Sequence, residues 1–72
     1  MNKYINLINL RKKNGLVQSE IADYLNISRV AYCHYETGRR KPPVSVLIEL
    51  SKLYNVSIDY LVSNTKRKAK KL

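Results

Sequence analysis

Cys33 and His34 are neighbours in the sequence, and each is the only residue of its type in the chain. Such a pair could bind a metal ion, or place a reactive thiol beside a base. In a helix, however, adjacent side chains point about 100° apart and cannot readily converge on one ion. Glu36 is the only plausible further ligand within a helical turn of either residue, whereas zinc sites use three or four protein ligands. The pattern therefore predicts no metal site.

A catalytic role for this pair is also disfavoured. Thiol catalysis needs a pocket and an oxyanion site beside the nucleophile, which so short a chain does not offer. No other constellation in the sequence supports an enzyme or implies a cofactor. Cys33 and His34 are then either surface residues without a role or part of a binding surface. His34 is the better candidate for binding, because an imidazole can donate a hydrogen bond.

The charge of the chain indicates the kind of partner. Fourteen Lys and Arg residues stand against five Asp and Glu, which gives a net charge of +9. A positive field of this kind attracts polyanions, chiefly nucleic acid or an anionic membrane surface. Residues 1–62 still hold nine basic and five acidic residues, so the body is basic without its C-terminal end. The KRKAKK segment at that end lacks the apolar face of a membrane-bound helix, so no membrane partner is predicted.

The length of 72 residues suits one small domain, which buries only about 60% of its unfolded surface. A single cysteine cannot form an internal disulfide, so a packed apolar core must stabilise the fold. No apolar run approaches the roughly 20 residues that span a bilayer, and the N-terminus lacks the apolar region of a signal peptide. These features predict a cytoplasmic protein with a domain over residues 1–63 and a basic, disordered tail over residues 64–72.

Helical periodicity runs through residues 3–62, without the strong alternation typical of strands. Gly15 and Gly38 are suited to follow helix ends, while Ser28 and Ser57 are suited to cap helix starts. The sequence therefore predicts an all-α fold with helices over residues 3–14, 18–26, 29–37, 44–55 and 58–62.

The apolar positions of these helices predict the core. With six tyrosines and no Phe or Trp, the chain is expected to bury most tyrosines, including Tyr24, Tyr32 and Tyr60, and to leave Tyr35 half exposed. Because they lie on different helix faces, they do not form a platform for stacking bases. The other positions predicted to pack are Tyr4, Leu7, Ile8, Arg11, Ile21, Ala22, Leu25, Val46, Leu47, Leu50, Leu53 and Tyr54.

The second and third predicted helices are joined by a short connection, as in a helix-turn-helix unit. From residue 10 onwards the chain carries LR before GL.Q, then E.A..L.IS, YE.GRR.P and LY.VS.DYL, in that order. Together these motifs resemble the lambda-repressor-like, or Cro/C1-type (XRE), helix-turn-helix domain of prokaryotes and phages over about residues 4–62. The resemblance implies a compact five-helix domain that binds double-stranded DNA sequence-specifically, with its third helix in the major groove.

The resemblance also assigns base contacts on the exposed face of the third helix, to Arg29, Val30, Cys33 and His34. Arg29 is the strongest of these, since its guanidinium matches the O6 and N7 acceptors of guanine. Val30 could meet a thymine methyl group, and Cys33 is left undecided between a DNA contact and no role.

Other residues are expected to hold the domain together or to position it on the duplex. The resemblance implies a partly buried ion pair between Arg11 and Glu36, which joins the first helix to the third. It places the side chain of Gln18 against a phosphate and the basic loop after the third helix along the DNA backbone. The residues expected to contact phosphates are Gln18, Ser28, Arg39, Arg40 and Lys41.

Three residues depart from the family pattern. Val17 replaces the usual Thr or Ser, so the second helix is expected to begin without a side-chain cap. Pro43 replaces a common Ser cap of the fourth helix. Tyr32 occupies a core position that is usually Ile or Val, so the core must accommodate a larger ring with its hydroxyl paired.

Proteins of this kind usually bind as two-fold dimers to half-sites about one helical turn apart. The resemblance therefore implies a homodimeric repressor on an inverted repeat, and analogy places the dimer contact around residues 55–62. The alternative is an antitoxin, or another protein-interaction module that uses the same fold. RNA binding is a less favoured alternative, which stays open because attraction to phosphates does not distinguish RNA from DNA.

Overall fold

The computed structural model describes residues 4–63, which form five helices and no strand. Each predicted helix is present, with bounds within two residues of the expectation, so the fold is all-α as predicted. The predicted tail over residues 64–72 lies outside the described residues. The helices are α1 (Ile5–Lys13), α2 (Gln18–Leu25), α3 (Arg29–Thr37), α4 (Val44–Tyr54) and α5 (Ile58–Val62).

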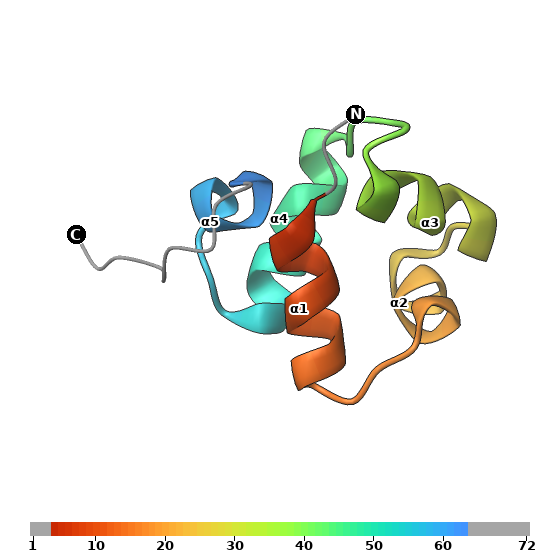
Figure 1. The fold of residues 1–72 in the computed structure, drawn as a ribbon, viewed down its shortest axis with the longest axis horizontal. Coiled ribbons are helices and arrows are strands. Elements are labelled where there is room, and N and C mark those ends of the chain that lie inside the picture. The colour runs from red at the N-terminus through yellow and green to blue at the C-terminus, as the bar shows by residue number, and fades with distance from the viewer. Residues whose placement is uncertain (1–3, 64–72) are drawn as a thin grey trace.

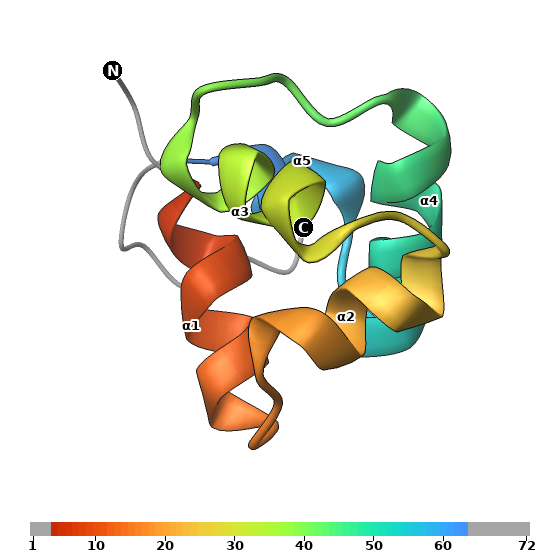
Figure 2. The ribbon, with the colours of Figure 1, turned by 90° about the vertical axis from the view of Figure 1, so that its right-hand side faces the viewer.

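The helices are arranged so that the helix-turn-helix unit forms one side of the molecule. Figure 1 shows α2 and α3 together on one side, α5 on the other, and α1 and α4 between them. The turned view in Figure 2 shows α3 lying above α2, with α1 beside both. Within residues 4–63, one face of α3 is therefore not covered by another helix.

Local sequence signals set the start and end of α3. The Ser28 Oγ accepts a hydrogen bond from the Ala31 N–H at 3.0 Å, so Ser28 caps the helix as predicted. At the other end, Gly38 has a φ of 81°, a left-handed conformation that a glycine adopts without strain. Because both signals are local, they could be predicted from the sequence alone.

The starts of α2 and α4 lack side-chain caps, as the departures at Val17 and Pro43 predict. The start of α2 retains half of a capping box, because the Glu20 carboxylate accepts a hydrogen bond from the Val17 N–H at 2.9 Å. The chain therefore enters α2 with one of the two usual cap hydrogen bonds.

The buried core corrects four expectations. Most tyrosines are not buried, because only Tyr32 and Tyr35 of the six are, and Tyr60 is only partly buried. Leu53 is 38% exposed, because each step of three residues from Leu47 turns the side chain 60° further around α4. Tyr24 is 47% exposed, and its hydroxyl lies 3.4 Å from the carbonyl oxygen of Glu49. Tyr35 is buried rather than half exposed, since it lies on the inner side of α3. The buried apolar residues are Leu7, Ile21, Ala22, Tyr32, Tyr35, Val46, Leu47, Leu50 and Leu61.

A buried amide joins the first and last helices. Asn6, which is 3% exposed, donates hydrogen bonds to the carbonyl oxygens of Tyr60 at 2.8 Å and Ser63 at 3.2 Å. These bonds bring side-chain donors to carbonyl groups at the C-terminal end of α5, where the Tyr60 carbonyl oxygen also accepts from the Ser63 N–H at 3.3 Å. This role could not be predicted from the sequence, because a polar residue beside Leu7 gives no signal of a partner more than fifty positions away.

Candidate nucleic-acid interface

The two faces of α3 differ sharply in burial. Tyr32, Tyr35 and Glu36 face the core and are buried. The opposite face carries the residues expected to contact bases. Arg29 and Val30 are exposed at the start of the helix, and Cys33 and His34 are partly exposed in the next turn. The structure therefore places all four on the outer side of one helix.

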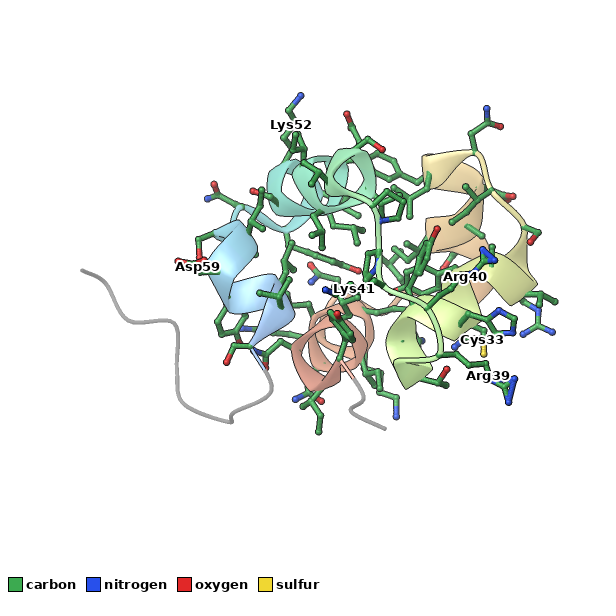
Figure 3. The ribbon with its side chains drawn as sticks, turned by 90° about the horizontal axis from the view of Figure 1, so that it is seen from above. Cys33, Arg39, Arg40, Lys41, Lys52 and Asp59 are labelled. Atoms are coloured by element: carbon green, nitrogen blue, oxygen red, sulfur yellow. The ribbon has the colours of Figure 1, made fainter. Side chains whose placement is uncertain are left out.

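The loop after α3 presents basic side chains at the same end of the molecule. Its backbone is fixed to the helix, since the Arg40 N–H donates to the His34 carbonyl oxygen at 3.2 Å. Figure 3 shows Arg39 and Arg40 on the same side of the molecule as Cys33, while Lys41 lies nearer the middle and Lys52 and Asp59 lie on the other side. Arg39, Arg40 and Lys41 are all exposed.

An ion pair fixes α3 to α1. The Arg11 Nε donates to Glu36 Oε2 at 2.7 Å, and the Arg11 Nη2 donates to Oε1 at 3.1 Å. The Glu36 side chain is 3% exposed and the Arg11 side chain 12%. Arg11 Nη1 also donates to the carbonyl oxygen of Leu16 at 3.0 Å, which fixes the loop that leads into α2. The two-pronged geometry is the strong form of this interaction.

Glu36 is held in its charged form. Its burial alone would raise the pKa of the carboxyl, but hydrogen bonds from Arg11 and Gln18 outweigh the burial, and the pKa lies below its ordinary value. The hydrogen bond to Glu36 likewise raises the pKa of Arg11. At neutral pH the pair is therefore an ionised carboxylate bound to a guanidinium.

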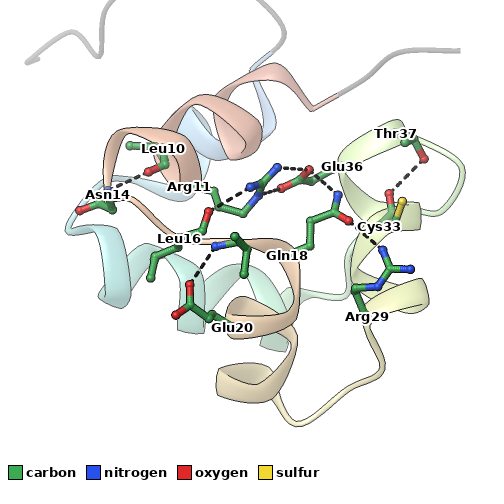
Figure 4. Close-up of polar contacts among 11 residues, drawn as sticks. Leu10, Arg11, Asn14, Leu16, Gln18, Glu20, Arg29, Cys33, Glu36 and Thr37 are labelled. Atoms are coloured by element: carbon green, nitrogen blue, oxygen red, sulfur yellow. Dashed lines mark hydrogen bonds and ion pairs between the residues drawn. The ribbon is translucent and has the colours of Figure 1, made fainter.

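Gln18 connects this pair to the outer face of α3. Its Nε2 donates to Glu36 Oε1 at 3.0 Å, and its Oε1 accepts from Arg29 Nη1 at 3.2 Å. Figure 4 shows the resulting chain of polar contacts from Arg11 through Glu36 and Gln18 to Arg29. The family resemblance implies only a phosphate contact for Gln18 and not this connection. The contact between Gln18 and Arg29 has no signal in the sequence, because the first residues of α2 and α3 come together only in the folded domain.

Two phenol groups lie near the same carboxylate. The ring of Tyr32 is fully buried, as the sequence analysis predicts, and its hydroxyl lies near Glu36. The Tyr32 hydroxyl helps to lower the pKa of Glu36, although neither it nor the buried hydroxyl of Tyr54 has a partner with full hydrogen-bond geometry among the described residues. Burial raises the pKa of Tyr32, and it raises the pKa of Tyr54 to about 12.

Residues 4–63 contain no group of three or more His, Cys, Asp or Glu side chains arranged to hold a metal ion. Within the same residues, no helix has the length and apolar character to cross a membrane.

Comparisons with known proteins identify the family of the chain. A family described as helix-turn-helix matches residues 7–61. An uncharacterized HTH-type transcriptional regulator of Bacillus subtilis (strain 168), YqaE, is 46% identical over 79% of this chain and 49% of its own length. The HTH-type transcriptional regulator ImmR of the same strain is 46% identical over 72% of this chain and 41% of its own.

A more distant similarity is to the cryptic phage CTXphi transcriptional repressor RstR of Vibrio cholerae. It is 34% identical over 78% of this chain and 50% of its own length. The chain thus spans about half the length of the curated relatives it matches. No solved structure matches the chain at a comparable level of significance.

Proposed function

The chain belongs to the Cro/C1-type (XRE) helix-turn-helix family, and from this membership we propose that it is a sequence-specific DNA-binding transcriptional regulator. The observation that carries the proposal is the outer face of α3, where Arg29 and Val30 are exposed while the inner face is buried in the core. A helix presented in this way can enter the major groove of double-stranded DNA. The protein would act in the cytoplasm, without a cofactor.

In this proposal Arg29 and its neighbours read the bases. Arg29 would donate two hydrogen bonds to a guanine, and Val30 would contact a thymine methyl group. His34 would donate to a base acceptor one turn further along the helix. Cys33 lies between them on the same face and would approach the DNA closely.

The phosphate contacts come from residues that surround the reading helix. Arg39, Arg40 and Lys41 are exposed beside α3, so their charges are free to approach one strand of the duplex. Contacts of this kind set the affinity and the register without reading sequence. Ser28 and the second N–H of the Gln18 amide would add hydrogen bonds to the backbone.

We also propose that the protein is a repressor and binds an inverted repeat as a homodimer. A relative, RstR, is named as a transcriptional repressor. The proposed contact between the two copies is the α4–α5 region, where Leu53, Ile58 and Val62 are between 36% and 39% exposed. Ile58 and Val62 are four residues apart in α5 and so share one side of the helix.

Selection of bound sequences from a pool of random duplexes tests the proposal. We expect an inverted repeat to be enriched, and binding to it to weaken linearly in log K against log salt concentration. Failure to enrich any sequence would contradict sequence-specific binding and favour a protein-interaction module. An asymmetric single site would contradict the homodimer but not DNA binding.

Two arginine variants then distinguish a residue that contacts bases from one that contacts the phosphate backbone. Arg29→Ala should relax the preference at one or two base pairs, at a cost of about 1–3 kcal/mol in discrimination. Arg39→Ala should weaken binding to all duplexes equally and reduce the salt slope. Equal losses on all sequences for Arg29→Ala would make Arg29 a phosphate contact instead.

A further inference from the structure

We propose that the buried Arg11–Glu36 ion pair takes part in base recognition, because it orients the amide of Gln18, which in turn positions Arg29. The inference rests on the proposed function, since it concerns how Arg29 reads a base. It makes Gln18 a positioning residue, and it gives a second role to a pair that otherwise only joins two helices.

The first step is the choice of amide orientation. An ionised carboxylate only accepts hydrogen bonds, so it selects the nitrogen side of a neighbouring amide. Glu36 Oε1 accepts from Arg11 Nη2 at 3.1 Å and from Gln18 Nε2 at 3.0 Å. With its nitrogen held by the carboxylate, the Gln18 side chain must turn its oxygen towards the outside of the domain.

The second step is the contact that this outward oxygen makes. A guanidinium only donates hydrogen bonds, so it needs an acceptor in this place. Arg29 Nη1 donates to Gln18 Oε1 at 3.2 Å, and Figure 4 shows the side chain extending from the start of α3 towards α2. If the amide were reversed, its N–H groups would face the guanidinium and the two donors would repel each other.

The third step is the benefit for DNA binding. An exposed arginine has many rotamers, and DNA binding must restrict them. The contact with Gln18 uses one of the five N–H groups of Arg29 and leaves others for a guanine edge. The Gln18 nitrogen also keeps a second hydrogen, so its contact with Glu36 is compatible with a phosphate contact.

A double-mutant cycle tests the positioning role. The variants are Gln18→Met, which keeps an unbranched side chain without hydrogen bonds, Arg29→Met, and the double variant. Each is measured on the selected duplex and on the same duplex with the base pair read by Arg29 replaced. We expect Gln18→Met to lower discrimination at that base pair by about three- to tenfold, and to have no such effect once Arg29 is absent.

The matched control pairs Gln18→Met with Arg39→Met, since Arg39 is also an exposed arginine beside α3, whereas the side-chain hydrogen bonds of Gln18 go to Glu36 and Arg29. Here the losses should be additive. If Gln18→Met weakened binding to both duplexes by the same factor and additively with Arg29→Met, Gln18 would be only a phosphate contact and the inference would be overturned. If the wild type itself did not discriminate between the duplexes, the proposed function would have failed instead.

Glu36→Gln tests the part played by the ion pair. An amide at position 36 can donate as well as accept, so it no longer dictates the orientation of Gln18. We expect discrimination at the Arg29 base pair to fall as in Gln18→Met, in protein that circular dichroism shows to be folded. Unchanged discrimination in folded protein would overturn the inference.

A spectroscopic measurement covers the case in which Glu36→Gln does not fold. Gln18 is the only glutamine in the chain, so its side-chain N–H signals are readily assigned by NMR. In the free wild-type protein we expect one of the two protons to exchange slowly with solvent, because it is bonded to Glu36. Equal, fast exchange of both protons would show that the carboxylate does not hold the amide.

Discussion

Side chains near the two ends of α1 connect this helix to α5 and to α3 by different kinds of interaction. Near its start, Asn6 donates to the carbonyl oxygens of Tyr60 and Ser63 and so holds the end of α5. Near its end, Arg11 donates to the Glu36 carboxylate and so holds α3. Both connections are buried, but the first is neutral and ends on backbone atoms, whereas the second is charged and continues through Gln18 to Arg29.

The difference between the two connections indicates what a buried ion pair can do that neutral hydrogen bonds cannot. Replacing a buried ion pair with apolar groups often stabilises a protein, so stability alone is weak support for keeping one. The neutral connection of Asn6 is enough to fix a short helix. The charged connection lies on the side of the molecule that carries the proposed DNA contacts, where a fixed carboxylate can set the direction of polar side chains around it.

The largest effect is expected from Glu36→Ala, which breaks the charged connection and leaves Arg11 without its buried partner. We expect the free energy of unfolding to fall by about 3–5 kcal/mol, measured by urea denaturation. Glu36→Gln is the control and should lose less, because the amide can still accept from Arg11. A loss below about 1 kcal/mol for Glu36→Ala would mean that the pair behaves like an exposed one.

Breaking the neutral connection should have a smaller and more local effect. Asn6→Ala leaves the carbonyl oxygens of Tyr60 and Ser63 without these donors, and we expect a loss of about 1–3 kcal/mol. Hydrogen exchange should become faster in α5, at Leu61 for example, and stay slow at Tyr32 in α3. Equal acceleration in both helices would contradict the view that the two connections act on separate regions.

Acid should distinguish the two connections without any mutation. The pKa of Glu36 lies below its ordinary value of 4.5, so its stabilising contribution is present above that value and is lost as the pH falls through the lowered folded-state pKa. The Asn6 connection does not titrate. We expect urea unfolding of the wild type to become easier over this acidic range, and Glu36→Gln to show a smaller change. Identical pH profiles would assign the acid sensitivity to other carboxylates.

The smallest effect is expected from Tyr32→Phe, which removes a hydroxyl beside the charged connection. Because this hydroxyl is buried near Glu36 without a partner of full hydrogen-bond geometry among the described residues, its loss should change the free energy of unfolding by less than about 1 kcal/mol, in either direction. Thermal and urea denaturation measure the change. A larger loss would mean that the hydroxyl supports the Glu36 carboxylate.

Features that depend only on residues adjacent in the sequence, such as helix bounds, could be predicted from the sequence. Ser28 and Gly38 set the bounds of α3 through their own backbone and side-chain chemistry, so these bounds could be read from the chain. The burial of residues at the edges of a helix could not be predicted in this way, because it depends on which other helix packs beside them. Leu53 and Tyr24 continue an apolar pattern in the sequence, yet each lies at the flank of its helix and is exposed.

The exposed residues of the candidate site could be predicted from the sequence, but the hydrogen bonds that connect them to the core could not. Helical spacing and the family resemblance bring Arg29, Val30, Cys33 and His34 to one face of α3. The bonds of Gln18 to Glu36 and Arg29 join α2 to α3, and no pattern in the sequence between positions 18 and 36 predicts them. Asn6 is a similar case, since its acceptors are backbone atoms of any residue type that ends α5.

The bonds at the two ends of the described chain have a practical consequence for attaching other molecules. The Tyr4 N–H donates to the Glu36 carbonyl oxygen at 3.0 Å, so a label joined before residue 4 starts at the end of α3. The Ser63 carbonyl oxygen is held by Asn6, next to α5, which lies across the molecule from α2 and α3 (Figure 1). A fluorophore or affinity label is therefore better placed on the C-terminal side of Ser63, which lies away from the proposed DNA-binding face of α3.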